Sequence, residues 1–582
     1  MPPRFLIILI LLLLFGFIPG EERVEEIIFQ GNKNYTSRFL KRLITTKTKQ
    51  VLDEANLDFD LQVLRNFYYN EGFQSVQVEK KIVTTQKGKI VYFIIQEGTR
   101  VRINIISLSG FLAFPEKKIQ NLLNLKVGDY LIMRNLENGE KQLIDLYKNS
   151  GYPYVEIERE IKVKDSLATV YFSIYEGPLS YIKEVQIRGN NKVNAWTIRR
   201  ASEIKLGEKF SQAHLYQAQS RLYATRLFER VAFYVIGMEA KSESLTIRFD
   251  VSELPARGLN FGIGYQLPPS RFLFGLGWEH LNILNRGQNL AFNSEFTPNF
   301  KGDYELNLEA VYKVPYLIRL PLNFATRPFL NLTDLEGNKT TEFGLETGIN
   351  RYLGSNLGIA LSNRFRSLKF SHPDTTTPDT TSRGITNSLI FNITYDSRNN
   401  FFNPNQGIYL SPILEVAGGL LLGNNDFYRA RCELRIYKKA FGELVLGVRG
   451  LVGSVLPYGR TLTIPYYEKF FVGGRNTLRG YDEKALGPDS IGKEHYGDFI
   501  INTNFEIRTN YYKNFGLVLF WDGAEIENGI TDFSFNRYQY SIGFGLRFNT
   551  PVGPVRLDYG KRLKNPKPAD RGKLYIGLLH AF

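Results

Sequence analysis

Residues Tyr304 to Ala310 read YELNLEA and alternate apolar and polar side chains at every step. A period of two is typical of a β-strand whose two faces meet different surroundings. Val555 to Tyr559, VRLDY, repeats the pattern near the end of the chain. When such strands close into a transmembrane barrel, one face meets lipid and the other lines the lumen. The alternation therefore predicts a membrane barrel in this part of the chain.

Strands of this kind recur from Gly258 to the last residue, Phe582. We predict sixteen antiparallel strands, because a membrane strand needs about 9–11 residues and single-chain bacterial barrels have even counts. A soluble β-sandwich is the alternative, but it would need polar rims. The predicted strands start near Leu259, Phe272, Gln288, Asp303, Leu322, Glu342, Asn356, Ile385, Gly407, Phe427, Glu443, Asp498, Phe515, Tyr538, Pro554 and Leu574.

The final predicted strand runs from Lys573 to Phe582. Alternation places Leu574, Ile576, Leu578 and Phe582 on one face, which we expect to meet lipid. A chain that ends on an aromatic residue at the lipid face resembles the C-terminal signal of bacterial outer-membrane proteins. Gly577 and Phe582 are the candidate residues of that signal.

The first part of the chain contains an internal repeat. Tyr68 to Phe73, YYNEGF, recurs as Tyr147 to Tyr152, YKNSGY, and more weakly as Tyr223 to Phe228, YATRLF. A second landmark, a strand that ends on an acidic residue, recurs at nearly the same spacing of roughly 80 residues. Its acidic residues are Glu97, Glu176 and Glu253.

The pattern within each repeat predicts one strand, two amphipathic helices and two further strands. This β-α-α-β-β order resembles the POTRA module, a periplasmic domain that precedes outer-membrane barrels. A generic α+β spacer repeat is the alternative. The expected domains are a signal peptide at 1–20, POTRA-like repeats at 21–99, 100–179 and 180–254, and an outer-membrane β-barrel at 255–582.

The first twenty residues have the layout of a secretory signal peptide. Arg4 precedes an apolar run from Phe5 to Phe17. The run is too short for a comfortable helical span, which needs about 20 residues. We therefore expect the mature chain to leave the cytoplasm after cleavage near Gly20.

Composition narrows the functional classes. Aromatic residues make up 14% of the chain, with 34 Tyr and 43 Phe, as suits the aromatic belts of membrane strands. The single Cys432 gives no internal disulfide and no cysteine metal cluster, and the five histidines show no metal-binding spacing. The net charge of +15 comes without a dense basic block or a nucleic-acid module. We expect no enzyme activity, no cofactor, no metal and no nucleic-acid partner.

A long gap between predicted strands holds Phe470 to Tyr481, FFVGGRNTLRGY. Gly473, Gly474 and Gly480 allow tight bends and positive φ, so this loop can fold back into the barrel. Arg479 would then need an acidic partner, since an unpaired guanidinium away from bulk water is costly.

Alternation on the later strands supplies two candidates for that partner. Phe505 and Ile507 are expected to face lipid, which turns Glu506 inward. The same argument on the next strand turns Asp522 inward. We predict Asp522 as the first partner of Arg479 and Glu506 as the second, since a planar guanidinium binds carboxylate bidentately. An ordinary lumenal salt bridge without functional consequence is the alternative.

With these motifs the chain resembles the outer-membrane assembly family that includes BamA and TamA, over nearly the whole mature chain. Three repeats are closest to TamA, whereas BamA commonly carries five. The matching motifs are the loop-six signature Gly473, Gly474, Leu478, Arg479, Gly480 and Tyr481; the turn from Asp396 to Gly407; Phe520 to Asp522; and Thr550 to Pro554 with Asp558 and Tyr559.

The resemblance implies a non-enzymatic assembly factor in the outer membrane of a Gram-negative bacterium, with its repeats in the periplasm. Its partners would be unfolded outer-membrane protein clients, outer-membrane lipid, and either accessory assembly proteins or a TamB-like partner. A two-partner-type secretion pore that exports one dedicated protein is the alternative; such pores share the loop motif but usually carry two repeats. A passive porin would not require the repeats.

The physical route open to an assembly factor is β-augmentation, the addition of a client strand to an exposed strand edge. In the repeats, Gln74 to Ile82 and Val231 to Ile236 are the candidate edges. In the barrel the candidate is the seam between the first strand, Leu259 to Gln266, and the last, Leu574 to Phe582. A weakly paired seam would accept client hairpins, because unsatisfied backbone groups in lipid are costly.

Overall fold

The computed structural model describes residues 23–582 except 267–270, 318–321, 336–337, 372–380, 441, 443, 492–493, 510–513, 551–552, 565–571 and 579. The expected signal peptide, 1–20, lies outside the described residues. The described residues form two compact units, of which the first comprises 23–189, 201–224 and 230–251 and the second lies within 190–200, 225–229 and 252–582. None of the helices within the described ranges combines the length and hydrophobicity that a membrane span requires.

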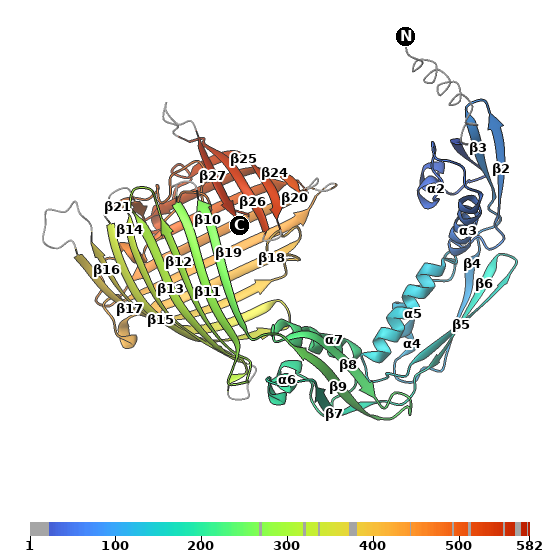
Figure 1. Ribbon diagram of the computed structural model, residues 1–582, viewed down its shortest axis with the longest axis horizontal. Helices are drawn as coiled ribbons and strands as arrows, with labels where there is room; N and C mark the ends of the chain where they lie inside the picture. The colour runs from blue at the N-terminus through green and yellow to red at the C-terminus, as the bar shows by residue number, and fades with distance from the viewer. Residues whose placement is uncertain are drawn as a thin grey trace, which may run out of the picture. The chain divides into compact units, whose positions relative to one another are not determined.

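The repeats share one order of elements, strand, two helices, two strands, as predicted (Figure 1). The first repeat contains β1 (Val24–Gln30), α2 (Ser37–Leu43), α3 (Glu54–Asn70), β2 (Gln77–Thr85) and β3 (Gly88–Gln96). The second contains β4 (Arg102–Ser109), α4 (Glu116–Leu123), α5 (Met133–Lys148), β5 (Glu156–Lys164) and β6 (Leu167–Tyr175). The third contains β7 (Tyr181–Arg188), α6 (Ala195–Ser202), α7 (Gln212–Ala224), β8 (Phe228–Ile236) and β9 (Ser244–Glu253).

Each repeat forms a three-stranded sheet with its last strand in the centre, in the order β1-β3-β2 in the first repeat. The first strand pairs with the central one in parallel and the second strand pairs with it antiparallel. Alternate residues of β3, Val91, Phe93 and Ile95, are buried, and Leu57 and Leu64 of α3 are buried in the same core. Because the central strand is covered on one face by helices, every second residue must be apolar.

The acidic landmark of each repeat has a structural cause. Glu97 accepts hydrogen bonds from the backbone and side-chain nitrogens of Asn34, at 3.0 and 2.6 Å. Glu253 likewise accepts from the backbone nitrogens of the corresponding turn in the third repeat. Gly31 begins the turn with φ +83°, and a Cβ there would clash with the carbonyl of Ile95. The carboxylate and the glycine therefore fix the same turn in each repeat.

The chain after the repeats forms a 16-stranded antiparallel sheet, which confirms the predicted barrel strands. Every predicted start lies within four residues of an observed one. The strands are β10 (Arg257–Gln266), β11 (Arg271–Ile283), β12 (Gln288–Pro298), β13 (Tyr304–Val314), β14 (Asn323–Leu335), β15 (Asn338–Leu353), β16 (Leu357–Ser371), β17 (Thr381–Asp396), β18 (Gly407–Ala417), β19 (Phe427–Lys439), β20 (Val445–Pro457), β23 (Phe499–Arg508), β24 (Phe515–Glu527), β25 (Gln539–Thr550), β26 (Gly553–Arg562) and β27 (Lys573–Leu578).

The barrel strands turn apolar side chains outward and polar ones inward. Phe505 and Ile507 on β23 are exposed on the outer face, while Glu506 and Arg508, which alternate with them, are buried. Such an exposed apolar surface suits lipid rather than water as the surrounding solvent.

The two ends of the sheet are β10 and β27, and their described residues pair with each other nowhere. Ten residues of β10 pair with β11, from Arg257 to Gln266. The last strand is much shorter, since β27 comprises 6 residues. The seam thus has one long and one short edge.

The structure corrects the expected course of the final strand. The strand ends at Leu578, and Phe582 does not share the lipid-facing side with Leu574. Phe582 is 6% exposed and lies beside the inward-facing residues Tyr437 and Arg508. Alternation failed here because it holds only while the backbone stays in the sheet, and residues 580–582 are not part of the strand.

Candidate functional site in the barrel lumen

The loop that joins β20 to β23 contains the predicted signature. It also holds the short element η3 (Tyr466–Glu468) and the hairpin of β21 (Asp489–Ile491) and β22 (Glu494–Tyr496). Gly473, Gly474 and Gly480 have φ of 124°, 86° and 97°, conformations that side chains rarely adopt. These bends carry the loop inward, and Arg479 is only 1% exposed.

The Arg479 guanidinium is held by the two predicted carboxylates. Its Nε and Nη2 donate to Asp522 Oδ2 and Oδ1 at 2.7 and 2.8 Å, a bidentate pair. Its Nη1 donates to Glu506 Oε1 at 2.7 Å. The backbone nitrogen of Arg479 also donates to Asp522, at 3.1 Å. The structure therefore brings these three residues together.

A third carboxylate completes the site. Asp558 on β26 accepts from Arg479 Nη1 at 3.2 Å and from Arg547 Nη1 at 2.5 Å. Sequence reasoning treated Asp558 only as part of a motif. The signal that could have found it is the alternation of Val555, Leu557 and Tyr559, which turns Asp558 inward.

Neighbouring groups fix the arginine and its partners. The guanidinium carbon lies 3.4 Å from the centre of the Phe520 ring, an arrangement that favours a cation over the ring face. Asn504 donates to Asp522 Oδ1 and to the carbonyl of Thr477, both at 2.8 Å. Because Arg479 and its three carboxylates leave no buried side-chain nitrogen or oxygen without a partner, these desolvated charges can be held in one geometry.

The loop also rests on the last two strands. Tyr575 of β27 accepts from the backbone nitrogen of Gly480 at 3.0 Å and donates to the carbonyl of Tyr481 at 2.7 Å. Gly480 lies against Gly560 of β26, where an added Cβ would come within 2.8 Å of the Gly480 nitrogen. The close approach of the loop backbone to β26 therefore requires glycine on the strand.

The other signature residues pack rather than pair. Leu478 and Tyr481 are buried in an apolar cluster with Val472 of the loop and Ile500 of β23. The backbone N–H of Gly473 donates a hydrogen bond to Thr477 Oγ1 at 3.0 Å. These contacts shape the turn that presents Arg479.

The candidate C-terminal signal residues, Gly577 and Phe582, contact neighbours of the Arg479 cluster rather than Arg479 itself. Gly577 lies beside Arg556, whose Nε would be 2.8 Å from an added Cβ. Arg508 donates to Glu506 Oε2 at 2.8 Å and to the carbonyl of Phe582 at 3.2 Å. Glu506 thus bonds both Arg479 and the residue that holds the end of the chain.

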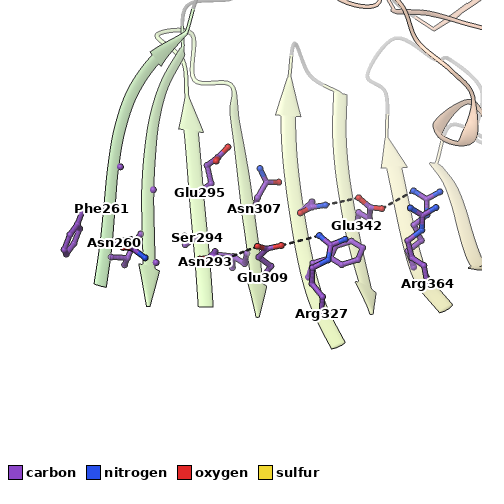
Figure 2. A pocket seen from close by; sticks show the side chains of 18 residues that line it. Asn260, Phe261, Asn293, Ser294, Glu295, Asn307, Glu309, Arg327, Glu342 and Arg364 are labelled. Atoms are coloured by element: carbon purple, nitrogen blue, oxygen red, sulfur yellow. Dashed lines mark hydrogen bonds and ion pairs between the residues drawn. The ribbon is translucent and has the colours of Figure 1, made fainter. Parts of the chain in front are cut away.

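The first barrel strands line a separate cavity of about 660 Å³ (Figure 2). Glu309 accepts from Asn293 at 2.9 Å and pairs with Arg327 at 3.3 Å. Glu342 farther along the wall accepts from Asn331 at 3.0 Å. The lumen wall near β10 is therefore a polar surface of mixed charge, whereas the Arg479 cluster is buried.

Within the described ranges, no cluster of three or more His, Cys, Asp or Glu side chains has the geometry to hold a metal ion. The Arg479 cluster is a set of paired charges, which restrains a loop and fixes its conformation.

Comparison with known proteins places the chain in a family. Residues 282–582 match the Omp85 superfamily domain, and 22–98, 101–177 and 180–253 each match the POTRA, or surface antigen variable number, repeat. The fold and the match define a class, barrels of the outer membrane preceded by POTRA repeats. The chain belongs to the Omp85 superfamily.

Full-length relatives are distant in sequence. The chain is similar to the outer membrane protein assembly factor BamA of Nitratidesulfovibrio vulgaris, with 24% identity over 93% of this chain and 68% of the relative. It is also similar to BamA of Neisseria meningitidis, with 21% identity over 94% of this chain and 76% of the relative. The crystal structure of BamA from Haemophilus ducreyi lacking POTRA domains 1–3 superposes with a TM-score of 0.62, at 18% identity, over 82% of this chain and 98% of that one.

Proposed function

We propose that this protein assembles β-barrel proteins into the outer membrane, receiving unfolded clients with its periplasmic repeats. The observation that carries the proposal is a POTRA-preceded Omp85 barrel whose lumen loop is held by a buried arginine and three carboxylates. Its similarity to BamA assembly factors along most of their length supports the same function. No step of the proposed activity requires bond chemistry, so the protein acts as a non-enzymatic scaffold.

Exposed strand edges supply the means of binding a client. In the first and third repeats, β2 and β8 are edge strands, on the far side of the central strand from β1 and β7. An edge strand presents unpaired N–H and C=O groups to which an extended client segment can add. Both predicted edge segments, Gln74 to Ile82 and Val231 to Ile236, overlap these strands.

The seam between β10 and β27 is the proposed site where a client leaves the protein for the lipid. The two strands carry backbone groups that the described sheet leaves unpaired between them. Leaving such groups in lipid costs several kcal/mol each, so a client strand that pairs with them is stabilised. A disulfide engineered between β10 and β27 should stop assembly reversibly, with activity restored by reductant; full activity of the oxidised protein would contradict an opening seam.

Depletion of the protein followed by a survey of the outer-membrane proteome tests the function itself. A general assembly factor predicts loss of many barrel proteins from the membrane. Loss of a few barrels indicates a specialised, TamA-like role with a TamB-like partner, and accessory proteins would copurify with the BamA-like form. An unchanged set of barrels together with loss of one secreted protein would instead establish a secretion pore.

A further inference from the structure

The lumen loop has another buried charge, eleven positions before Arg479 in the chain. Glu468, the last residue of η3, is 1% exposed. It accepts from Arg429 Nη2 on β19 at 2.8 Å and from Thr386 Oγ1 on β17 at 2.8 Å, and it pairs with Arg366 on β16. One loop carboxylate is therefore bound by groups from three strands.

The barrel wall around Glu468 carries more arginines than carboxylates. Arg364 and Arg429 both pair with Glu415 of β18, each at 2.6 Å. Arg366 pairs with Glu342 of β15 at 3.3 Å. Three wall arginines thus face two wall carboxylates, and Glu468 supplies the third negative charge. Without it the wall would hold an uncompensated positive charge in a desolvated place, which is costly.

The residues on either side of Glu468 are also held. Tyr467 lies so close to Gly384 of β17 that an added Cβ there would clash with its hydroxyl, which accepts from Asn425 at 3.2 Å. Lys469 pairs with Asp489 at 3.1 Å and with Asp498 at 3.2 Å. Three consecutive loop residues each have their own partners, so this contact is a specific docking site.

We propose that Glu468 is a second anchor of the loop, opposite in charge to Arg479, and that it positions the loop for client assembly. Glu468 fastens the loop to the strand group β16, β17 and β19, whereas Arg479 fastens it to β23, β24 and β26. In the sheet, β20 lies between the two groups. The ten-residue segment between the anchors, 469–478, therefore ties two parts of the wall together. The link to assembly rests on the proposed function; the anchoring does not.

The substitution Glu468→Gln tests the anchor, because it removes the charge and keeps the shape. The matched control is Glu494→Gln in the same loop, whose pair with Lys484 at 2.8 Å is partly exposed to solvent. In the purified full-length protein, trypsin should cleave the loop after Arg475 at least about tenfold faster in Glu468→Gln, since breaking a buried pair frees the segment. The control should be cleaved at the wild-type rate.

The variant Glu468→Asp keeps the charge on a shorter side chain, so it should restore part of the protection. If Glu468→Gln fails to form a heat-modifiable barrel, the cleavage rate of Glu468→Asp can still be compared with that of the wild type. Equal cleavage of wild type, both Glu468 variants and the control would overturn the anchor.

Assembly of a barrel client by protein in lipid vesicles gives the second readout. We expect Glu468→Gln to assemble the client several-fold more slowly than wild type, with Glu468→Asp in between and the control unchanged. A released loop with unchanged assembly would overturn the positioning role. If the wild-type protein assembles no client while the loop is still released by Glu468→Gln, the proposed function fails and the anchor stands.

Discussion

Phe93 in the first repeat and Arg479 in the barrel are both buried, yet they are buried for opposite reasons. The ring of Phe93 packs against Phe29, with 5.4 Å between ring centres, inside an apolar core. Arg479 lies among Asp522, Glu506 and Asp558 in a polar interior. Both regions use strands with a period of two. The solvent outside decides which face turns in, because water surrounds the repeats and lipid surrounds the barrel.

This difference predicts where a substitution acts. In a repeat, loss of apolar volume weakens folding, whereas in the barrel the strands are held by their hydrogen bonds and by lipid. Loss of a lumenal charge should therefore leave the barrel folded and affect the loop. Four experiments test the contrast.

The largest expected effect is that of Arg479→Ala on activity. The substitution leaves three carboxylates without their shared cation, and breaking such a buried pair costs about 3–5 kcal/mol. We expect a folded, heat-modifiable barrel that fails to support growth when the wild-type protein is depleted. Arg479→Lys should rescue poorly, since it keeps the charge but loses the bidentate contact. Normal assembly of client barrels by Arg479→Ala would show that the cluster is an ordinary lumenal salt bridge without a role in assembly.

The next effect is on the stability of a repeat. Phe93→Ala should destabilise the first repeat by about 3–5 kcal/mol, the usual cost of removing a buried aromatic side chain. Urea titration of the full-length protein, followed by proteolysis within the repeats, measures it. Tyr92→Ala is the matched control, because Tyr92 is a neighbouring aromatic residue on the opposite, half-buried face of β3. The barrel should remain heat-modifiable in both variants.

A pair of adjacent residues on β13 tests the two faces of the barrel. Leu308 is exposed on the outer face, whereas Asn307 lines the lumenal cavity. Leu308→Arg should destabilise the barrel by about 2–4 kcal/mol, because it places a charge in lipid. Asn307→Arg should change the stability of the barrel little, because Asn307 lines a polar cavity. Equal costs in a folding titration in lipid vesicles would mean that the assigned faces are wrong.

The smallest effect is a pH dependence of the first repeat. Burial, and then a 2.9 Å hydrogen bond to Glu71, raise the pKa of the Tyr35 phenol to about 12 from 10.0. The neutral phenol is favoured in the folded state, so its stabilisation is complete below pH 10 and lost as pH rises through about 12. Tyr35→Phe should remove this part of the alkaline loss, measured by urea titration at pH 9 and pH 11.5. An identical alkaline loss in the variant would show that Tyr35 does not contribute.

Much of the architecture was predictable because it depends on local patterns. Alternation predicted the barrel strands and turned Glu506 and Asp522 inward, since a strand's side chains point to opposite faces whatever its neighbours are. The limits appear at particular residues. Phe582 was assigned to the lipid face, but residues 580–582 are not part of the strand and the ring packs against Tyr437 and Arg508 on the lumenal side. Asp558 has the same inward signal as Asp522, yet its distance from Arg479 depends on how near β26 lies to the loop.

The sequence by itself determined the repeats, the barrel strands, the faces of those strands and the glycines that let the loop bend. Each of these depends on a residue and its near neighbours in the chain. Only the tertiary structure decided which charges meet: Glu468 with Arg366 and Arg429, and Arg508 with the end of the chain. The physical reason is that an ion pair inside the barrel joins residues far apart in sequence, and the order and register of the strands fix their distance, which no local pattern encodes.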